Sequence, residues 1–225
     1  ILFPPQCLGC KKEGTFLCQP CKTKLHVLPP VCIGCGRMTP AELPHPAGHT
    51  CKHCRRRIPI SVFLSPISYR HPLVNHLIHE FKYRRIQMLA PIFVDLLTSY
   101  ISSYRIVFPQ HALIIPIPLH PRKQRIRGFN QASLLGYELS KRLSIPIDKQ
   151  TLIRVIATPS QAMLTARSRH ENVQDVFSIR DTTLLNGKSI ILIDDVKTTG
   201  ATLTQAARML KQAGAKEIWA ITVAH

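Results

Sequence analysis

The segment that most constrains the fold of this chain is residues 190–202, IILIDDVKTTGAT. Its four apolar residues predict a buried strand, which ends in two neighbouring carboxylates, Asp194 and Asp195. A hydroxyl- and glycine-rich turn follows, and an apolar stripe over 203–210 then predicts an amphipathic helix. A polar loop between a strand and a helix is typical of a parallel α/β sheet, whose ligands bind at the carboxyl ends of the strands.

The chemical groups of this loop predict a sugar phosphate as the ligand. A helix N-terminus offers backbone N–H groups and a favourable dipole to phosphate, and Gly200 lets the backbone approach closely. Asp194 and Asp195 can accept hydrogen bonds from a vicinal diol or hold Mg²⁺. A solvated turn beside a helix start would explain one or two of these residues. A 5-phosphoribose that carries a pyrophosphate explains the whole ordered set.

The net charge of +18 favours a polyanionic partner, with nucleic acid before an anionic membrane surface. Nine Lys and Arg stand against two acidic residues in 1–60, and 21 against ten in 61–225, so the excess is not a detachable tail. A basic surface that only attracts phosphorylated metabolites is the simpler alternative. We expect the DNA contacts at Arg55, Arg56, Arg57, Arg122, Lys123 and Arg125.

All eight cysteines lie in the first 54 residues as C-x-x-C pairs, namely Cys7/Cys10, Cys18/Cys21, Cys32/Cys35 and Cys51/Cys54. Four such pairs so close together predict two closed, structural Cys₄ zinc sites rather than disulfides. A redox pair or an iron–sulfur cluster fits the number and spacing less well. Sequential pairing is the simplest arrangement, and a cross-braced pairing stays open. Metal binding would drive the folding of so small a module.

The sequence Ile58-Pro59 predicts a boundary between a zinc module, 1–58, and an α/β domain, 59–225. Apolar stripes predict helices over 74–81 and 89–100. Further strands are expected at 61–69, 112–118, 176–179 and 217–223. No apolar run approaches the ~18 residues needed to span a bilayer, and no secretory signal precedes the first cysteine.

Two polar segments complete the predicted site. The stretch 119–131 reads as a basic loop at the same rim as Asp194, where it would hold a leaving pyrophosphate. A plain solvated turn is an equally good interpretation of this stretch. Residues 158–173 are predicted to form a mobile loop with a short helical end, which could close over a bound ligand.

The order of these motifs resembles the ComF family along essentially the whole chain. The motifs that carry the resemblance are the four C-x-x-C pairs, PIPLHP, RGFNQ, 161–173 and LIDDVKTTGAT. That family joins an N-terminal double zinc ribbon to a type I phosphoribosyltransferase domain. The resemblance therefore implies an α/β fold with a type I phosphoribosyltransferase-like parallel sheet flanked by helices.

The resemblance also implies a function. Competence members of the family support natural transformation and handle single-stranded DNA on the cytoplasmic side of the inner membrane. We therefore expect a cytoplasmic protein, peripheral at that membrane, with single-stranded DNA, a phosphoribosyl ligand and other competence proteins as partners. A phosphoribosyltransferase that acts on an unidentified acceptor is the alternative, and an adaptor with a vestigial pocket is a third.

Individual residues follow from the same resemblance. It implies that Asp194 and Asp195 bind the ribose hydroxyls and Mg²⁺. It implies that the 5-phosphate is bound by Thr198, Thr199, Gly200, Ala201 and Thr202. The second motif, with candidate pyrophosphate contacts, is matched by Arg127, Gly128, Phe129, Asn130 and Gln131. Purine phosphoribosyltransferases often have a carboxylate base where this chain has Thr198, which cannot act as a base near pH 7, so no catalytic residue is assigned.

Overall fold

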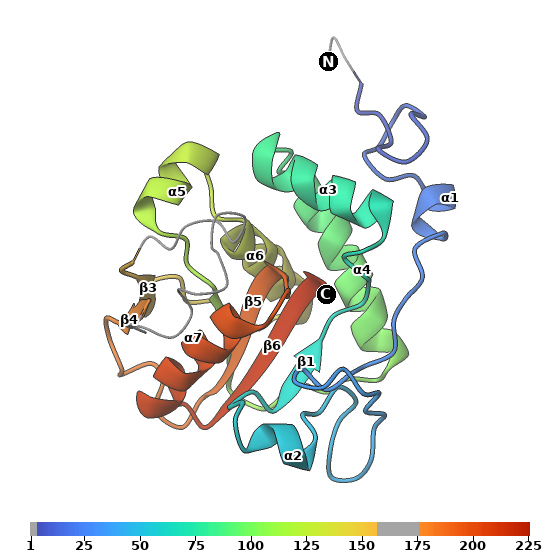
Figure 1. Ribbon diagram of the computed structural model, residues 1–225. Coiled ribbons are helices and arrows are strands. Elements are labelled where there is room, and N and C mark those ends of the chain that lie inside the picture. Colours follow the sequence, from blue (N-terminus) through green and yellow to red (C-terminus); the bar gives the residue numbers. More distant parts are fainter. Residues whose placement is uncertain (1–3, 157–175) are drawn as a thin grey trace, which may run out of the picture.

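A parallel sheet of four strands, in the order β1–β6–β5–β2, forms the centre of the molecule (Figure 1). The computed structural model describes residues 4–156 and 176–225. The strands are β1 (Val62–Leu64), β2 (Ala112–Pro116), β5 (Ser189–Val196) and β6 (Glu217–Ala224). A separate antiparallel pair is formed by β3 (Leu152–Arg154) and β4 (Phe177–Ile179), and β4 packs beside α7 (Ala201–Gln212).

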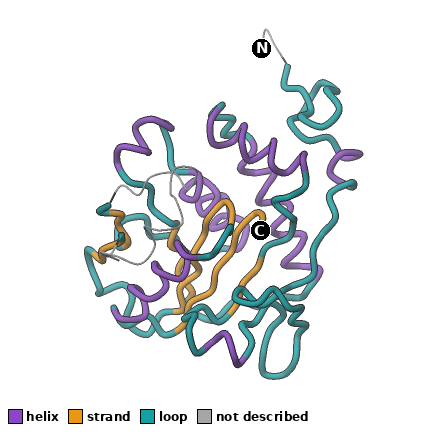
Figure 2. Tube along the Cα trace, in the orientation of Figure 1, coloured by secondary structure: helices purple, strands orange, loops and turns teal. Residues whose placement is uncertain are grey.

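Helices cover both faces of this sheet (Figure 2). One face carries α4 (Leu89–Ser103) and α6 (Gln131–Leu143), with α3 (Pro72–Tyr83) packed on α4, and the other face carries α7. Alternate residues of β5 belong to the two cores, with Ile191 and Ile193 on the α4 side and Ile190 and Leu192 on the α7 side. Burial on both faces explains why this strand is continuously apolar in the sequence.

The basic stretch 119–131 is the main difference from the sequence-based expectation, because most of it is a helix, α5 (Pro121–Arg127). The His120 ring caps the helix by accepting a hydrogen bond from the Arg122 amide at 3.2 Å. Gly128 ends the helix with a φ of 82°. Proline in the first turn and glycine after the last turn are ordinary helix signals. They predict this helix, but the four cations between them suggested a solvated loop instead. The predicted mobile loop 158–173 lies outside the described residues.

Both edges of the sheet are covered by irregular chain. Along β1, the Phe63 amide donates to the Gly48 carbonyl at 2.8 Å and the Thr50 amide to the Ser61 carbonyl at 2.7 Å. Gly48 has a φ of +82°, and a β-carbon there would collide with the Phe63 carbonyl oxygen. Along β2, the Ile114 amide donates to the Pro146 carbonyl, and the Ile114 carbonyl accepts from the Asp148 amide, both at 2.9 Å. The sheet therefore presents short, shielded edges.

The cysteine-rich module packs into these same cores. Leu17, Cys21 and Leu25 are buried in the cluster that contains α3 and α4, whereas Ile33 belongs to the cluster on the α7 side. The module is therefore integrated with the α/β domain, and the boundary at residue 58 stays a prediction. Within the described part of the chain, no helix is long and apolar enough to cross a membrane.

The module itself comprises two short helices and the turns around them. They are α1 (Gln19–Lys22) and α2 (Lys52–Arg55). Each helix follows directly on a cysteine, Cys18 in the first case and Cys51 in the second.

Candidate functional site

Asp194 and Asp195 lie at the carboxyl end of β5, as the sequence predicts, although the strand runs one residue further, to Val196. Asp194 is in register with Thr222 of β6, near the end of that neighbouring strand. The Asp195 amide donates to the Asp194 carboxylate at 2.9 Å. The two side chains therefore belong to the strand end that forms the rim where parallel sheets bind ligands.

Lys82 is a site residue that the sequence analysis missed. Its ammonium lies 2.8 Å from the Asp195 carboxylate, and both side chains are largely buried, with exposed fractions of 18% and 9%. Burial lowers the pKa of Lys82, but the attraction and hydrogen bond of Asp195 outweigh this and leave the pKa above its ordinary value. Lys82 follows the apolar stripe of α3, and no spacing in the sequence relates it to the strand end.

Three more cations lie near Lys82 or Asp194. Lys123 and Arg127 of α5 line a cavity of about 320 Å³ together with Lys82. Arg154 of β3 is close enough for Asp194 to oppose the lowering of its pKa by burial. Burial, followed by repulsion from Arg154 and Arg127, lowers the pKa of Lys123. Such a concentration of positive charge at a partly buried site favours a ligand that carries several negative charges.

Asp194 itself holds its proton unusually well. Its exposure is intermediate, yet the protein around it displaces much of its water. This desolvation, followed by repulsion from Asp195, raises the pKa of Asp194 to about 7, although Lys82 acts in the opposite direction. A cation that replaces water beside this carboxylate would favour its ionised form.

The turn after β5 has the backbone that a phosphate-binding loop needs. Gly200 is the N-cap of α7, with a left-handed φ of 79°, and no side chain there caps the helix. The Ala201 amide bonds the Thr199 hydroxyl at 3.3 Å. The Lys197 side chain lies with its ammonium 5.6 Å from the centre of the Phe63 ring. The predicted set Thr198 to Thr202 thus spans the bend 198–200 and the first two residues of the 12-residue helix α7.

The second motif is divided by the structure. Arg127 faces the cavity, where it lies over the Tyr83 ring at 5.4 Å and donates to the Gln131 side chain at 3.1 Å. Asn130 instead caps α6 by accepting from the Ala132 amide, and its amide group donates to the Ile117 carbonyl, both at 3.0 Å. A ligand-binding role for Gly128, Asn130 and Gln131 stays a prediction.

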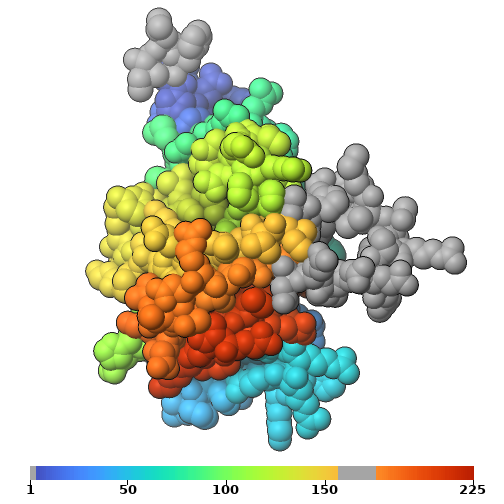
Figure 3. Space-filling model, turned by 90° about the vertical axis from the view of Figure 1, so that its left-hand side faces the viewer, coloured from blue at the N-terminus to red at the C-terminus, as the bar shows by residue number. Residues whose placement is uncertain are grey.

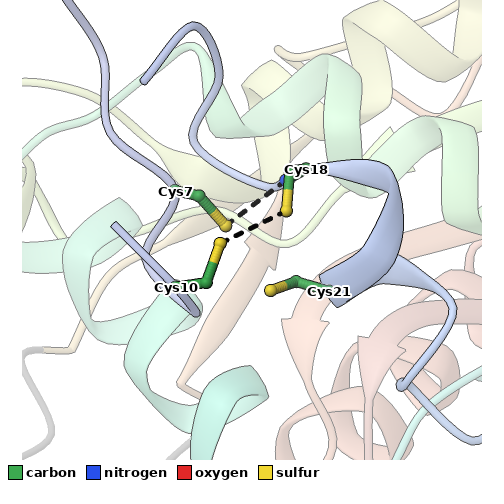
Figure 4. A group of neighbouring side chains, drawn as sticks. All are labelled: Cys7, Cys10, Cys18 and Cys21. Atoms are coloured by element: carbon green, nitrogen blue, oxygen red, sulfur yellow. Dashed lines mark hydrogen bonds between the residues drawn. The ribbon is translucent and has the colours of Figure 1, made fainter. Parts of the chain in front are cut away.

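The eight cysteines gather into two groups of four, in the sequential arrangement. Figure 4 shows the first group, in which Cys7, Cys10, Cys18 and Cys21 point toward a common centre. Within each group all sulfur atoms lie within 4.8 Å of one another, for example Cys10 and Cys18 at 3.5 Å and Cys35 and Cys51 at 3.9 Å. Tetrahedral zinc with Zn–S bonds of about 2.3 Å needs sulfurs ~3.8 Å apart, so both groups fit zinc.

The two groups repeat one local structure. In both, an amide donates to the first cysteine sulfur at 3.4 Å, from Cys18 in one and Cys51 in the other. Gly9 and Gly34 occupy the same place in C-L-G-C and C-I-G-C, and a β-carbon on either would come within 2.8 Å of a cysteine sulfur. The module is a tandem pair of zinc ribbons.

The candidate DNA contacts lie in two places. Arg55 and Arg56 line a hollow of about 520 Å³ on the second ribbon, with His45, His49 and Lys52. Arg122 and Arg125 are exposed on α5, whereas Lys123 turns into the site cavity. Figure 3 shows α5 and the segment 52–57 toward opposite ends of one face, with α7 between them.

Two segments of the chain match known protein families. Residues 1–55 match the double zinc ribbon domain and residues 130–225 the phosphoribosyl transferase domain. The sheet and its helices are therefore a type I phosphoribosyltransferase-like domain, joined to two zinc ribbons.

Three relatives match along most of their length. The chain is 30% identical to competence protein F of Haemophilus influenzae, over 96% of this chain and 95% of that protein. It is 30% identical to the DNA utilization protein YhgH of Salmonella typhi, over 91% and 89%. It is 32% identical to competence protein ComFC of Bacillus subtilis, over 90% and 81%. The chain belongs to the ComF family, which confirms the expectation from its motifs.

We predict two zinc ions per chain, bound by residues 7–54. Because Cys10 and Cys35 hold equivalent positions, Cys10→Ser and Cys35→Ser should each lower the zinc content by about one ion. Elemental analysis of the purified protein measures this directly. One zinc ion in the wild type, or iron in its place, would contradict the assignment.

We also predict a pH dependence of stability from Asp194. Its folded-state pKa of about 7 lies above the ordinary value, so its contribution to stability is complete below about pH 4 and is lost as the pH rises through 7. Relative to Asp194→Asn, the wild type should lose on the order of 2 kcal/mol between pH 5.5 and 8 in urea unfolding. Glu217→Gln, at the other end of the sheet, is the matched control. Parallel pH profiles for the wild type and Asp194→Asn would refute the shift.

Proposed function

We propose that this protein handles single-stranded DNA during DNA uptake and carries a pocket for Mg²⁺ with PRPP or ribose 5-phosphate. The observation that supports the pocket most directly is the pair of carboxylates at the end of β5, next to Lys82 and the cations of α5 and β3. The names of the relatives, which refer to competence and DNA utilization, support the DNA-handling part. We propose a cytoplasmic location at the inner membrane, with other competence proteins as partners.

A bound ligand would use the site as follows. Asp194 and Asp195 would accept hydrogen bonds from the ribose hydroxyls and hold Mg²⁺, and the turn Thr198–Thr202 would hold the 5-phosphate. Lys82 pairs with one oxygen of Asp195 in this structure, and it would release that oxygen if Mg²⁺ binds there. The released ammonium would then face the pyrophosphate together with Lys123 and Arg127.

A transferase that acts on an unidentified acceptor is the second candidate function. The carboxylate pair and its cations are the groups that departure of a pyrophosphate would require. Release of pyrophosphate from PRPP in the presence of an acceptor would select this function.

The first experiment tests the pocket. Asp194→Asn should abolish Mg²⁺-dependent binding of PRPP in calorimetry, because the variant has no carboxylate at this position to hold the metal. Glu217→Gln removes the same charge at the amino end of β6, where it pairs with Ser189, and should bind PRPP as the wild type does. Unchanged PRPP affinity in a folded Asp194→Asn variant would refute the proposed pocket.

The second experiment tests DNA binding. Weak, sequence-independent binding to oligo-dT should become weaker as salt rises, with a log–log slope that grows by roughly 0.7 for each phosphate that the protein binds. Replacing Arg55, Arg56 and Arg57 with Ala should weaken binding and flatten that slope by up to about 2, and so should replacing Arg122, Lys123 and Arg125.

The matched control for these variants replaces three exposed cations from other surfaces, Arg70, Arg105 and Lys216. It carries the same net charge, so an equal decrease in affinity would assign binding to overall charge rather than to the two clusters. No binding at low ionic strength, or binding independent of salt, would favour the transferase.

A further inference from the structure

Another cleft, with a different set of lining residues from the site cavity, lies between α5 and α6. It has a volume of about 510 Å³ and is lined in part by Gln124, Phe129, Asn130, Ser133, Tyr137 and Lys149. Lys123 and Arg127 of the same helix line the site cavity instead. α5 thus contributes side chains to two separate hollows. The proposed phosphoribosyl ligand would bind in only one of them, the site cavity.

Tyr137 is the distinctive group of this cleft, which we call the Tyr137 cleft. It lies on the face of α6 opposite the buried stripe, and 41% of its surface is exposed. The Lys141 ammonium lies 4.1 Å from the centre of its ring and the Lys149 ammonium 5.0 Å. Two cations therefore lie over this exposed aromatic ring, held by cation–π attraction.

The charges around the ring leave these lysines available to an anion. Lys141 lies 3.9 Å from Glu138, and the exposed position of the lysine makes that pairing weak. The nearby Arg142 is engaged by Asp95 at 2.7 Å and adds little. Lys149 lines the cleft itself from an exposed position. The Tyr137 cleft is therefore net cationic.

Two residues that line the cleft, Phe129 and Asn130, are held in place by contacts with the rest of the domain. Asn130 caps α6, and the Phe129 ring packs against Phe81 with ring centres 5.6 Å apart. Phe129 and Asn130 thus give the cleft a fixed wall, while Tyr137, Gln124 and Lys149 face it from exposed positions. A cleft with one fixed side and an exposed aromatic ring on the other can bind a planar group such as a nucleic-acid base.

We propose that the Tyr137 cleft binds single-stranded DNA by stacking a base on Tyr137, with Lys141 and Lys149 moving from the ring to the neighbouring phosphates. Base stacking with flanking cations is how proteins hold single strands without reading their sequence. A duplex would not fit this role, because its base faces are covered. The inference rests on the proposed DNA-handling function and adds to it an interaction that depends on the bases rather than on charge.

The test compares oligo-dT with an abasic strand of the same length by fluorescence anisotropy. Tyr137→Leu keeps an apolar side chain but removes the ring, and should bind oligo-dT roughly 5- to 150-fold more weakly. Its affinity for the abasic strand should equal that of the wild type. Tyr137→Phe keeps the ring and should retain binding to both strands.

The lysines provide an independent readout. Replacing Lys141 and Lys149 with Ala should weaken binding to both strands and flatten the salt dependence by roughly 0.7 for each phosphate that the variant no longer binds. Tyr137→Leu should leave the slope unchanged, because it removes no charge. Retained zinc content and circular dichroism show that the variants are folded.

The outcomes separate this inference from the proposed function. If the wild type binds oligo-dT and Tyr137→Leu binds it equally well, the stacking site is refuted and DNA handling stands. An equal decrease in affinity for the abasic strand would also refute stacking. If the wild type binds neither strand at low salt, both the stacking site and the proposed DNA function are refuted.

Discussion

Two neighbouring carboxylates at the end of a buried strand set the electrostatics of this protein. Water is scarce around Asp194, so charge on it and on Asp195 must be balanced by cations from the protein or from a ligand. Lys82 comes from α3 and Arg154 from β3, which are far apart in the sequence and converge on this point. Lys82 is the cation that balances Asp195 in this structure. If the proposed Mg²⁺ binds at Asp195, it would exchange this internal cation for an external one, and the affinity would include the cost of that exchange.

Much of the fold could be predicted because it depends on local patterns. The apolar periods over 74–81 and 89–100 became α3 and α4, and the continuous run at 190–193 became the core of β5. The cysteine spacing was enough to anticipate two metal sites. In contrast, the regular strand β1 ends at Leu64, and the rest of the stretch 61–69 pairs with β6 only through an isolated bridge between Ile67 and Ala224.

The site was harder to predict where it depends on convergence. Asp194, Asp195 and the glycine turn are contiguous, so one segment revealed them. Lys82 reaches Asp195 only through the packing of α3 on α4, and Tyr137 meets Lys149 only through the turn after α6. Interactions of this kind leave no spacing in the sequence. The helix α5 is a different case, because its proline and glycine signals were present and the charge of 119–131 suggested a loop instead.

The zinc ribbons are parts of the sheet's environment rather than an appendage. The first packs with α3 and α4, whereas the second contributes Ile33 to the core on the α7 side and Ala47 to the core on the α4 side. Each ribbon thus contributes apolar residues to a core that also includes the α/β domain, and small metal-binding modules generally couple their folding to their ion. Metal binding and the packing of the larger domain are therefore energetically linked.

The backbone hydrogen bonds that join Gly48 and Thr50 to the β1 segment also cover one edge of the sheet. An unpaired strand edge is a template for association with another chain, and here the cover over that edge is a segment that leads directly into the cysteines of the second zinc site. The second ribbon therefore has two roles: it gathers four cysteine sulfurs, and its backbone occupies hydrogen-bonding groups of the β1 edge that could otherwise pair with another chain.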